Sequence, residues 1–129
     1  MTTEEMSKRI NDAAEKVVGC AYKVSNTLGV GFLEKVYENA LVIEIRKAGL
    51  GVEQQHPVTV FYEGDVVGNY EADLLVEDCL LVELKVAKAF DDVHMAQCIN
   101  YLRATGKKMC LLLNFGKARM DFKRVVLNL

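Results

Sequence analysis

Hydrophobic residues recur at helical spacing in two segments at the start of the chain. A capping-box pattern, Thr2 with Glu5, precedes a hydrophobic stripe over residues 6–28. The stripe predicts a long amphipathic helix that ends in the glycine-containing segment 29–31. A second stripe predicts another helix over residues 33–49. Two helices are therefore expected before the first strand.

The middle of the chain changes from helical spacing to short apolar runs that are typical of strands. Residues 58–62 are rich in strand-forming side chains, and a turn signal at 63–65 leads into a return strand that begins at Val66. Two more apolar runs, 72–76 and 79–86, follow and are separated by a Glu-Asp pair typical of a tight hairpin. This part of the chain is expected to form an antiparallel meander.

The last part of the chain predicts one more helix and two strands. Asp91 and Asp92 place negative charge at the start of a helix that Gly106 closes. The continuous apolar run 109–113 indicates a strand covered on both faces, and residues 120–127 indicate a final strand. Because no linker, repeat or low-complexity stretch interrupts the pattern, residues 1–129 are expected to form a single α/β or α+β domain.

Composition agrees with one ordinary globular domain. The 129 residues are 51% hydrophobic and 26% charged, enough for a core that depends on neither disulfides nor a structural metal. No signal-peptide core or membrane-length apolar run is present, so we expect a cytoplasmic protein without a membrane partner. The four cysteines are scattered without a CxxC spacing, which favours reduced thiols over disulfides or zinc.

The net charge of −2 argues against a generic nucleic-acid binder, but the charge is unevenly distributed. The first 102 residues hold 9 basic and 17 acidic residues, whereas the remainder holds 7 basic residues and 1 acidic residue. The basic end is either a solvated face or a surface that contacts phosphates. Its members are Arg103, Lys107, Lys108, Lys117, Arg119, Lys123 and Arg124.

Two charged residues interrupt an apolar strand. In the run Leu80–Val86, Glu83 and Lys85 share one face with Leu81, and burial of such charges is costly unless they are paired or bound to metal. Asp73, on the preceding strand, is expected to lie beside them. One interpretation is a cross-strand salt bridge on a half-exposed hairpin. The other is a divalent-metal site suited to phosphodiester hydrolysis.

One further acidic residue is a candidate for the same site, and a polar pair lies on the third predicted helix. Glu34, near the start of the second predicted helix, is either a third oxygen ligand or an ordinary surface glutamate. Gln97 and Tyr101 are one turn apart on the third predicted helix and therefore share a face. The acidic residues would hold the metal, and a lysine beside them would orient the attacking water or stabilise developing negative charge.

In this order along the chain, the motifs resemble the PD-(D/E)xK nuclease superfamily, and more closely its small bacterial GxxExxY proteins. Gly31 to Tyr37 reads GxxExxY, Asp73 followed by Glu83-Leu84-Lys85 reads D…ExK, and Gln97 to Tyr101 reads QxxxY. The segment Asn114-Phe115-Gly116 is similar to the closing segment of that family. The resemblance covers about residues 4 to 126. Ala72 stands where the name-giving proline would precede the aspartate.

The resemblance implies a restriction-endonuclease-like αβββαβ core, with a central mixed sheet flanked by helices and an extra N-terminal helix. It implies that Glu34, Asp73 and Glu83 bind Mg²⁺ or Mn²⁺, that Lys85 acts on the attacking water, and that Gln97 and Tyr101 line the catalytic site. The expected activity is metal-dependent hydrolysis of DNA or RNA phosphodiesters. The alternative is a non-catalytic nuclease-fold module recruited by nucleic acid, a partner protein or a second copy of the chain.

Overall fold

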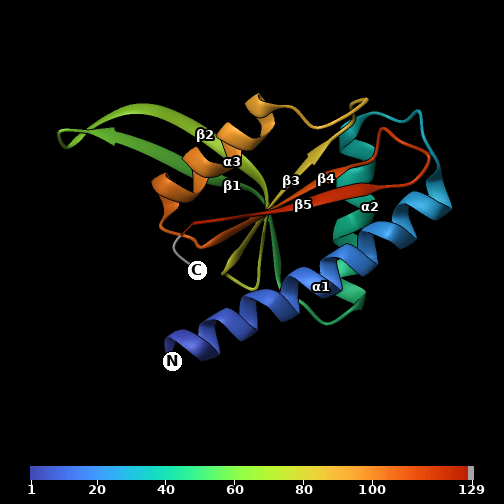
Figure 1. The fold of residues 1–129 in the computed structure, drawn as a ribbon, viewed down its shortest axis with the longest axis horizontal. Coiled ribbons are helices and arrows are strands. Elements are labelled where there is room, and N and C mark those ends of the chain that lie inside the picture. The colour runs from blue at the N-terminus through green and yellow to red at the C-terminus, as the bar shows by residue number, and fades with distance from the viewer. Residues whose placement is uncertain (128–129) are drawn as a thin grey trace.

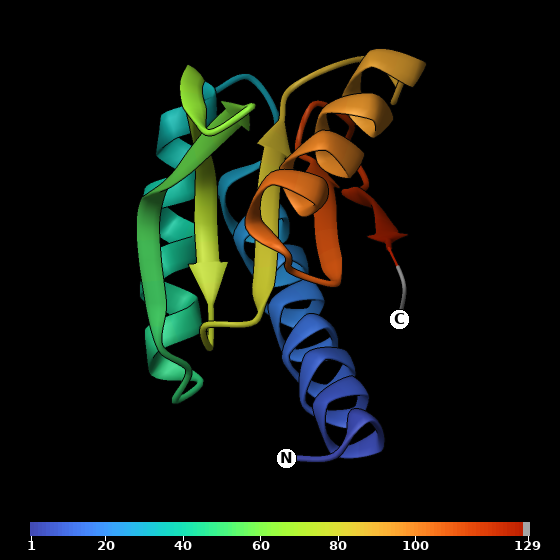
Figure 2. The same ribbon diagram turned by 90° about the vertical axis from the view of Figure 1, so that its left-hand side faces the viewer.

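The computed structural model describes residues 1–127, which form a five-stranded sheet. Helices cover both faces of this sheet (Figures 1 and 2). Within residues 1–127 the strand order is β1-β2-β3-β4-β5, and the β3–β4 pair is the only parallel one. The elements in chain order are α1 (Thr3–Leu28), α2 (Glu34–Lys47), β1 (Val52–Tyr62), β2 (Asp65–Val76), β3 (Leu80–Lys85), α3 (Asp92–Thr105), β4 (Met109–Asn114) and β5 (Asp121–Val126). The predicted α+β architecture with its three-stranded meander and additional N-terminal helix is confirmed.

The two faces of the sheet carry separate hydrophobic cores. Helices α1 and α2 pack on one face, and α3 packs on the other (Figure 2). Strand β3 alternates between them as predicted, because Leu80 and Val82 join the α1–α2 core while Leu81 joins the α3 core. All six residues of β4 are buried, as expected for a strand with both faces covered.

Local signals determine the ends of two helices. The Thr2 hydroxyl accepts a hydrogen bond from the Glu5 amide at 3.0 Å, and the Glu5 carboxylate accepts one from the Thr2 amide at 3.3 Å. Asp91 caps α3 in the same manner, and Gly106 ends that helix in the left-handed conformation with φ of 73°. The capping box predicted at Thr2 and the helix end predicted at Gly106 are confirmed, whereas at Asp91 the sequence predicts only favourable negative charge.

The first two strands differ in extent from the sequence-based prediction. Strand β1 begins at Val52 instead of residue 58, and the runs that begin at Val66 and Ala72 belong to the single strand β2. Polar side chains obscured this in the sequence, because β1 lies at the edge of the sheet, where polar residues can face solvent.

The β1–β2 hairpin extends beyond the rest of the sheet (Figure 1). Strand β2 pairs with β3 only from Leu74 to Val76, whereas it pairs with β1 along nearly its whole length. The distal half of the hairpin is therefore a two-stranded arm, and it lies beside α3 (Figures 1 and 2).

No helix within residues 1–127 combines the length and hydrophobicity needed to cross a membrane.

Candidate active site

Strands β2 and β3 separate where the predicted acidic residues lie. Beyond the Leu74–Val82 pair, side chains replace the regular backbone ladder. The Asp73 amide donates to Glu83 Oε2 at 3.0 Å, and the Leu84 amide donates to Asp73 Oδ2 at 2.8 Å. The two carboxylates thus satisfy backbone groups that the fork between the strands would leave unpaired. The predicted proximity of Asp73 and Glu83 is confirmed.

Glu83 is buried, with 3% of its surface exposed. Burial, followed by contact with the neighbouring Asp73 carboxyl, raises the pKa of Glu83 to about 9. Lys85 favours the ionised form of Glu83 but does not offset these two effects. At neutral pH the pair therefore carries a proton on Glu83, which removes the repulsion between two adjacent carboxylates.

Lys85 points to the α3 face and forms a chain of polar contacts there. Its Nζ donates to Gln97 Oε1 at 3.1 Å, and Gln97 Nε2 donates to Tyr101 Oη at 3.3 Å. Burial and the nearby Glu83 raise the pKa of Tyr101 to about 12, so the phenol stays protonated at neutral pH. Within residues 1–127 the ion pairs do not include Lys85, so the alternative of a Lys85 salt bridge does not describe this side chain.

Glu34 is the first residue of α2, which begins near the end of β3 (Figure 1). Burial and then repulsion from Asp73 raise the pKa of the Glu34 carboxyl, while Lys85 and His94 act in the opposite direction. The side chain is therefore within electrostatic reach of the β2–β3 fork, although it comes from a different element. His94 was not predicted to lie near this site, and its sequence position at the start of α3 gave no signal of it.

Tyr37 fixes the loop that presents Glu34. It is fully buried, its hydroxyl donates to the Gly29 carbonyl oxygen at 2.6 Å, and it accepts from the Phe32 amide at 3.3 Å. Its ring stacks on Phe115 with the ring centroids 4.8 Å apart. The tyrosine of the GxxExxY pattern thus has a positioning role, which the sequence alone did not show.

The closing segment, which begins at the last residue of β4, holds the loop that follows Lys85. Asn114 is fully buried, and its side chain forms hydrogen bonds with both the amide and the carbonyl of Ala87 at 3.1 and 2.9 Å. At Gly116, a β-carbon would lie 2.5 Å from the backbone nitrogen and oxygen of Ala87, so only glycine fits. The resemblance singled out this segment, but its contact with Ala87 required the tertiary structure.

A second buried carboxylate, Glu38, helps to hold the elements around the site together. It is 3% exposed and accepts hydrogen bonds from Lys35, Gln54 and Gln55 at 2.8 to 3.1 Å. Gln55 has a positive φ of 54°, and the β1–β2 pairing is interrupted here, between the Gln54–Leu74 and His56–Ala72 pairs. These contacts tie α2 to β1.

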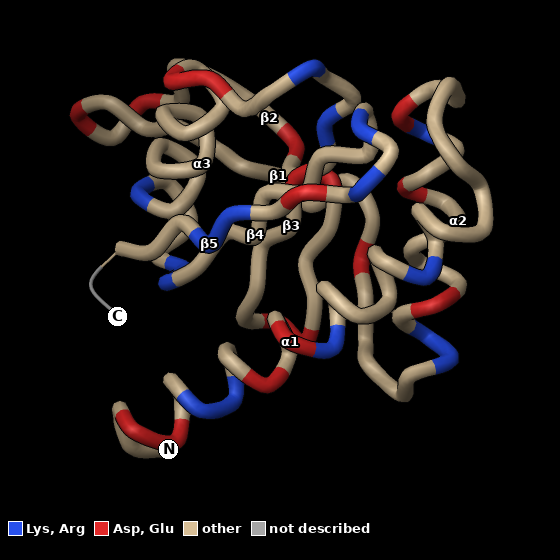
Figure 3. The backbone as a smooth tube through the Cα atoms, turned by 45° about the vertical axis from the view of Figure 1, so that its right-hand side comes forward, with Lys and Arg blue, Asp and Glu red and all other residues tan. Residues whose placement is uncertain are grey.

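The seven basic residues at the end of the chain are spread over α3, β5 and the loops before and after β4 (Figure 3). Arg103 is on α3, whereas Lys107 donates to the Asp78 carbonyl oxygen at the β2–β3 turn, away from the carboxylates. Lys117 pairs with Asp121, and Arg124 contacts Asn11 of α1. The structure does not gather these side chains into one patch, and their contact with phosphates stays a prediction.

The donor chemistry of the fork fits a divalent cation. Mg²⁺ typically binds through one or two carboxylates and keeps several waters, and Asp73 with Glu83 supplies two adjacent carboxylates. Within the described chain, no group of three or more His, Cys, Asp and Glu side chains is arranged to hold a metal ion. The fit therefore rests on the Asp73–Glu83 pair, with Glu34 as a nearby third carboxylate.

Comparison with known proteins identifies the family. The model of the PD-(D/E)XK nuclease superfamily matches residues 11–125, so this chain belongs to that superfamily. No curated protein matches the chain in sequence.

Solved structures show the same fold at low sequence identity. The alkaline exonuclease LHK-Exo from Laribacter hongkongensis is 13% identical with a TM-score of 0.50, over 84% of this chain and 76% of the exonuclease chain. Its complex with dAMP gives a TM-score of 0.51 at 13% identity, over 88% and 82% of the two chains. The structure of SSO0001 is 14% identical with a TM-score of 0.57, over 74% of this chain and 51% of its own.

Proposed function

We propose that this protein is a divalent-metal-dependent nuclease of the GxxExxY branch, and that it hydrolyses DNA or RNA phosphodiesters at the β2–β3 fork. The observation that carries the proposal is the pairing of Asp73 with the buried Glu83 beside Lys85. Two carboxylates forced together in a partly buried fork form a site that a cation would stabilise. Membership of a nuclease superfamily supports the same chemistry.

In this proposal, Asp73 and Glu83 hold Mg²⁺ or Mn²⁺, and Glu34 contributes from the start of α2. When bound, the metal ion supplies acidified water and charge neutralisation at the phosphate. The ammonium group of Lys85, held by Gln97, orients the attacking water and stabilises negative charge as it develops. Tyr101 is a positioning residue, because it acts on Lys85 only through Gln97.

Cleavage by purified protein tests this proposal directly. End-labelled single-stranded and duplex DNA and RNA are incubated with Mn²⁺ or Mg²⁺, and the products are resolved by electrophoresis. We expect Asp73→Asn, Glu83→Gln and Lys85→Met each to reduce the cleavage rate by at least a hundredfold. The matched control is Lys16→Met, which removes an exposed lysine on α1, on the other side of the sheet.

Two outcomes would contradict the proposal. Cleavage that survives in the Lys85→Met and Asp73→Asn variants would place the activity elsewhere or in a contaminant. A folded wild-type protein that binds nucleic acid but cleaves none of the four substrates with either metal would instead support the non-catalytic binding module.

A further inference from the structure

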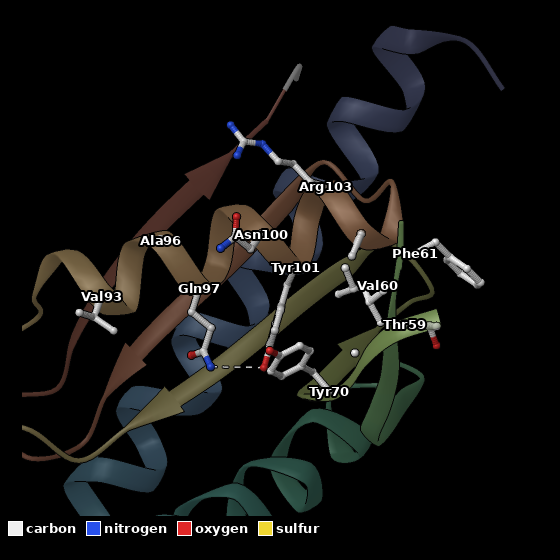
Figure 4. Close-up of a pocket in the computed structure, with 13 residues that line it drawn as sticks. Thr59, Val60, Phe61, Tyr70, Val93, Ala96, Gln97, Asn100, Tyr101 and Arg103 are labelled. Carbon is white, nitrogen blue, oxygen red and sulfur yellow. Dashed lines mark hydrogen bonds between the residues drawn. The ribbon is translucent and has the colours of Figure 1, made fainter. Parts of the chain in front are cut away.

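A groove runs between α3 and the arm formed by β1 and β2 (Figure 4). Its volume is about 840 Å³, within the range of natural small-ligand pockets and larger than one nucleobase requires. One wall comes from α3, and the opposite wall comes from the distal half of the hairpin. The groove is thus formed by two elements that are far apart in sequence.

The hairpin wall is aromatic and accessible. Tyr70 and Phe61 line the groove and keep 54% and 62% of their surfaces exposed. Gly68 lies under the Tyr70 ring, because a β-carbon there would be 3.2 Å from Tyr70 Cε2. The exposed ring of Tyr70 therefore presents a flat apolar surface, of the kind on which nucleobases stack.

The groove differs from the rest of this acidic chain in its charge. The chain has 18 acidic residues, but none lines the groove, and Arg103 is the charged residue among its lining side chains. Asn100, on the same helix, adds an exposed amide with both a donor and an acceptor. An apolar ring, an amide and a guanidinium favour an anionic ligand that carries an aromatic base.

The groove is continuous with the candidate active site. Gln97 and Tyr101 line its inner end, and Gln97 holds the Lys85 ammonium group (Figure 4). The Tyr70 and Tyr101 rings approach each other with centroids 6.0 Å apart. A nucleic-acid strand that places a phosphate at Lys85 therefore has its neighbouring nucleotide next to the groove.

We propose that this groove binds an unpaired nucleobase adjacent to the scissile phosphate, so that the substrate is single-stranded nucleic acid or a strand with an unpaired nucleotide. The inference rests on the proposed nuclease function and specifies its substrate class. A base inside a duplex has its faces stacked and its edges paired, so it cannot also stack on Tyr70. Only a base outside the duplex stack fits this wall.

Binding and cleavage are measured separately to test the groove. Binding is followed by fluorescence anisotropy of a labelled 12-nucleotide single strand and a matched hairpin duplex, with Asp73→Asn protein to prevent turnover. We expect the single strand to bind at least tenfold tighter than the duplex. Tyr70→Leu should weaken single-strand binding about tenfold, because stacking on one aromatic ring is worth about that factor or more.

A negative charge introduced into the groove gives a second test, which does not depend on the Tyr70 ring. Asn100→Glu introduces a carboxylate into the groove at an exposed helix position and should weaken single-strand binding about tenfold. Two matched controls carry the same changes outside the groove, namely Tyr62→Leu at the exposed hairpin tip and Asn69→Glu on β2. Both controls should bind within twofold of the parent protein.

The outcomes separate the groove from the nuclease proposal. Equal affinity for single strand and duplex, or an unchanged affinity in both groove variants, overturns the groove inference even when wild-type protein cleaves nucleic acid. Groove-dependent binding of the single strand without metal-dependent cleavage supports the groove and overturns the nuclease proposal. Dimerisation that Asn100→Glu abolishes, without any oligonucleotide binding, overturns the inference and assigns the groove to a second copy of the chain.

Discussion

The proton on Glu83 gives a quantitative prediction for protein stability. Glu83→Gln replaces a buried carboxyl group with an amide of nearly the same shape. The glutamine oxygen can still accept from the Asp73 amide. Its NH₂ group can donate to the Asp73 carboxylate, with which the protonated Glu83 carboxyl shares a side-chain hydrogen bond. The substitution therefore keeps the contacts of the neutral form and removes only the ability to ionise.

The magnitude follows from the pKa of Glu83, which rises from 4.5 to about 9 on folding. Below pH 4.5 both the folded and the unfolded chain hold this proton, and above pH 9 neither does. Between these values only the folded chain holds it, so the free energy of unfolding falls by about 1.4 kcal/mol per pH unit. From pH 4.5 to 7, wild-type protein should lose about 3 kcal/mol that Glu83→Gln does not lose.

Urea unfolding in EDTA, at pH 4.5, 5.5, 6.5 and 7.0, measures this difference. The unfolding free energy of Glu83→Gln minus that of wild type should increase by about 3 kcal/mol across the series, which is about 10 °C in Tm for a domain of this size. Parallel pH profiles for the two proteins would refute the reasoning, because they would mean that Glu83 ionises in the folded state with an ordinary pKa.

A second carboxylate provides a control with the opposite sign. Glu38 is as buried as Glu83, but its oxygens accept hydrogen bonds from Lys35, Gln54 and Gln55. Glu38→Gln would set an NH₂ group against these donors and remove the charge that pairs with Lys35. We expect this variant to be less stable than wild type by about 2 kcal/mol at pH 7.

Three further predictions concern the metal, the closing loop and the GxxExxY tyrosine. At pH 7, calorimetric titration with Mn²⁺ in buffers of different ionisation enthalpy should show that about one proton is released per bound ion, because Glu83 must ionise to bind the metal. Binding heats that do not depend on the buffer would contradict this. In urea unfolding, Gly116→Ala should destabilise the protein by about 3 kcal/mol, because its β-carbon would clash with Ala87. Gly19→Ala, which adds a β-carbon in open space on α1, should instead stabilise the protein by up to about 1 kcal/mol. Tyr37→Phe should lower Mn²⁺ affinity severalfold by releasing the loop before Glu34, and unchanged affinity would show that this loop is held by other contacts.

The amino-acid sequence was sufficient for features that depend on local interactions. Helix starts at Thr2 and Asp91 follow from side chains that bond amides three residues away, so neighbouring residues encode them. The faces of β3 follow from strand alternation, which puts Glu83 and Lys85 on the same face. The order of these motifs was also enough to indicate the superfamily that the family model identifies.

The extent of β1 and the supports of the site depend on contacts between residues far apart in the chain. Gln54 and Gln55 lie before the run 58–62 that predicted the first strand, but they belong to β1, and their side chains donate hydrogen bonds to Glu38 on α2. The sequence does not show that Asn114 is buried and holds a loop, because its hydrogen-bond partner Ala87 is 27 positions away in the chain. Such contacts have no periodic signature in the sequence.

The sequence by itself determined which residue types meet at the site: carboxylates on neighbouring strands, a lysine two positions after one of them, and a Gln–Tyr pair on a helix. The tertiary structure decided their chemical state and their surroundings. Glu83 retains a proton because burial and Asp73 penalise its charge, and the groove exists because the β1–β2 arm extends past the sheet beside α3. Desolvation and the shape of a groove both arise from packing between distant segments, and no local pattern contains that information.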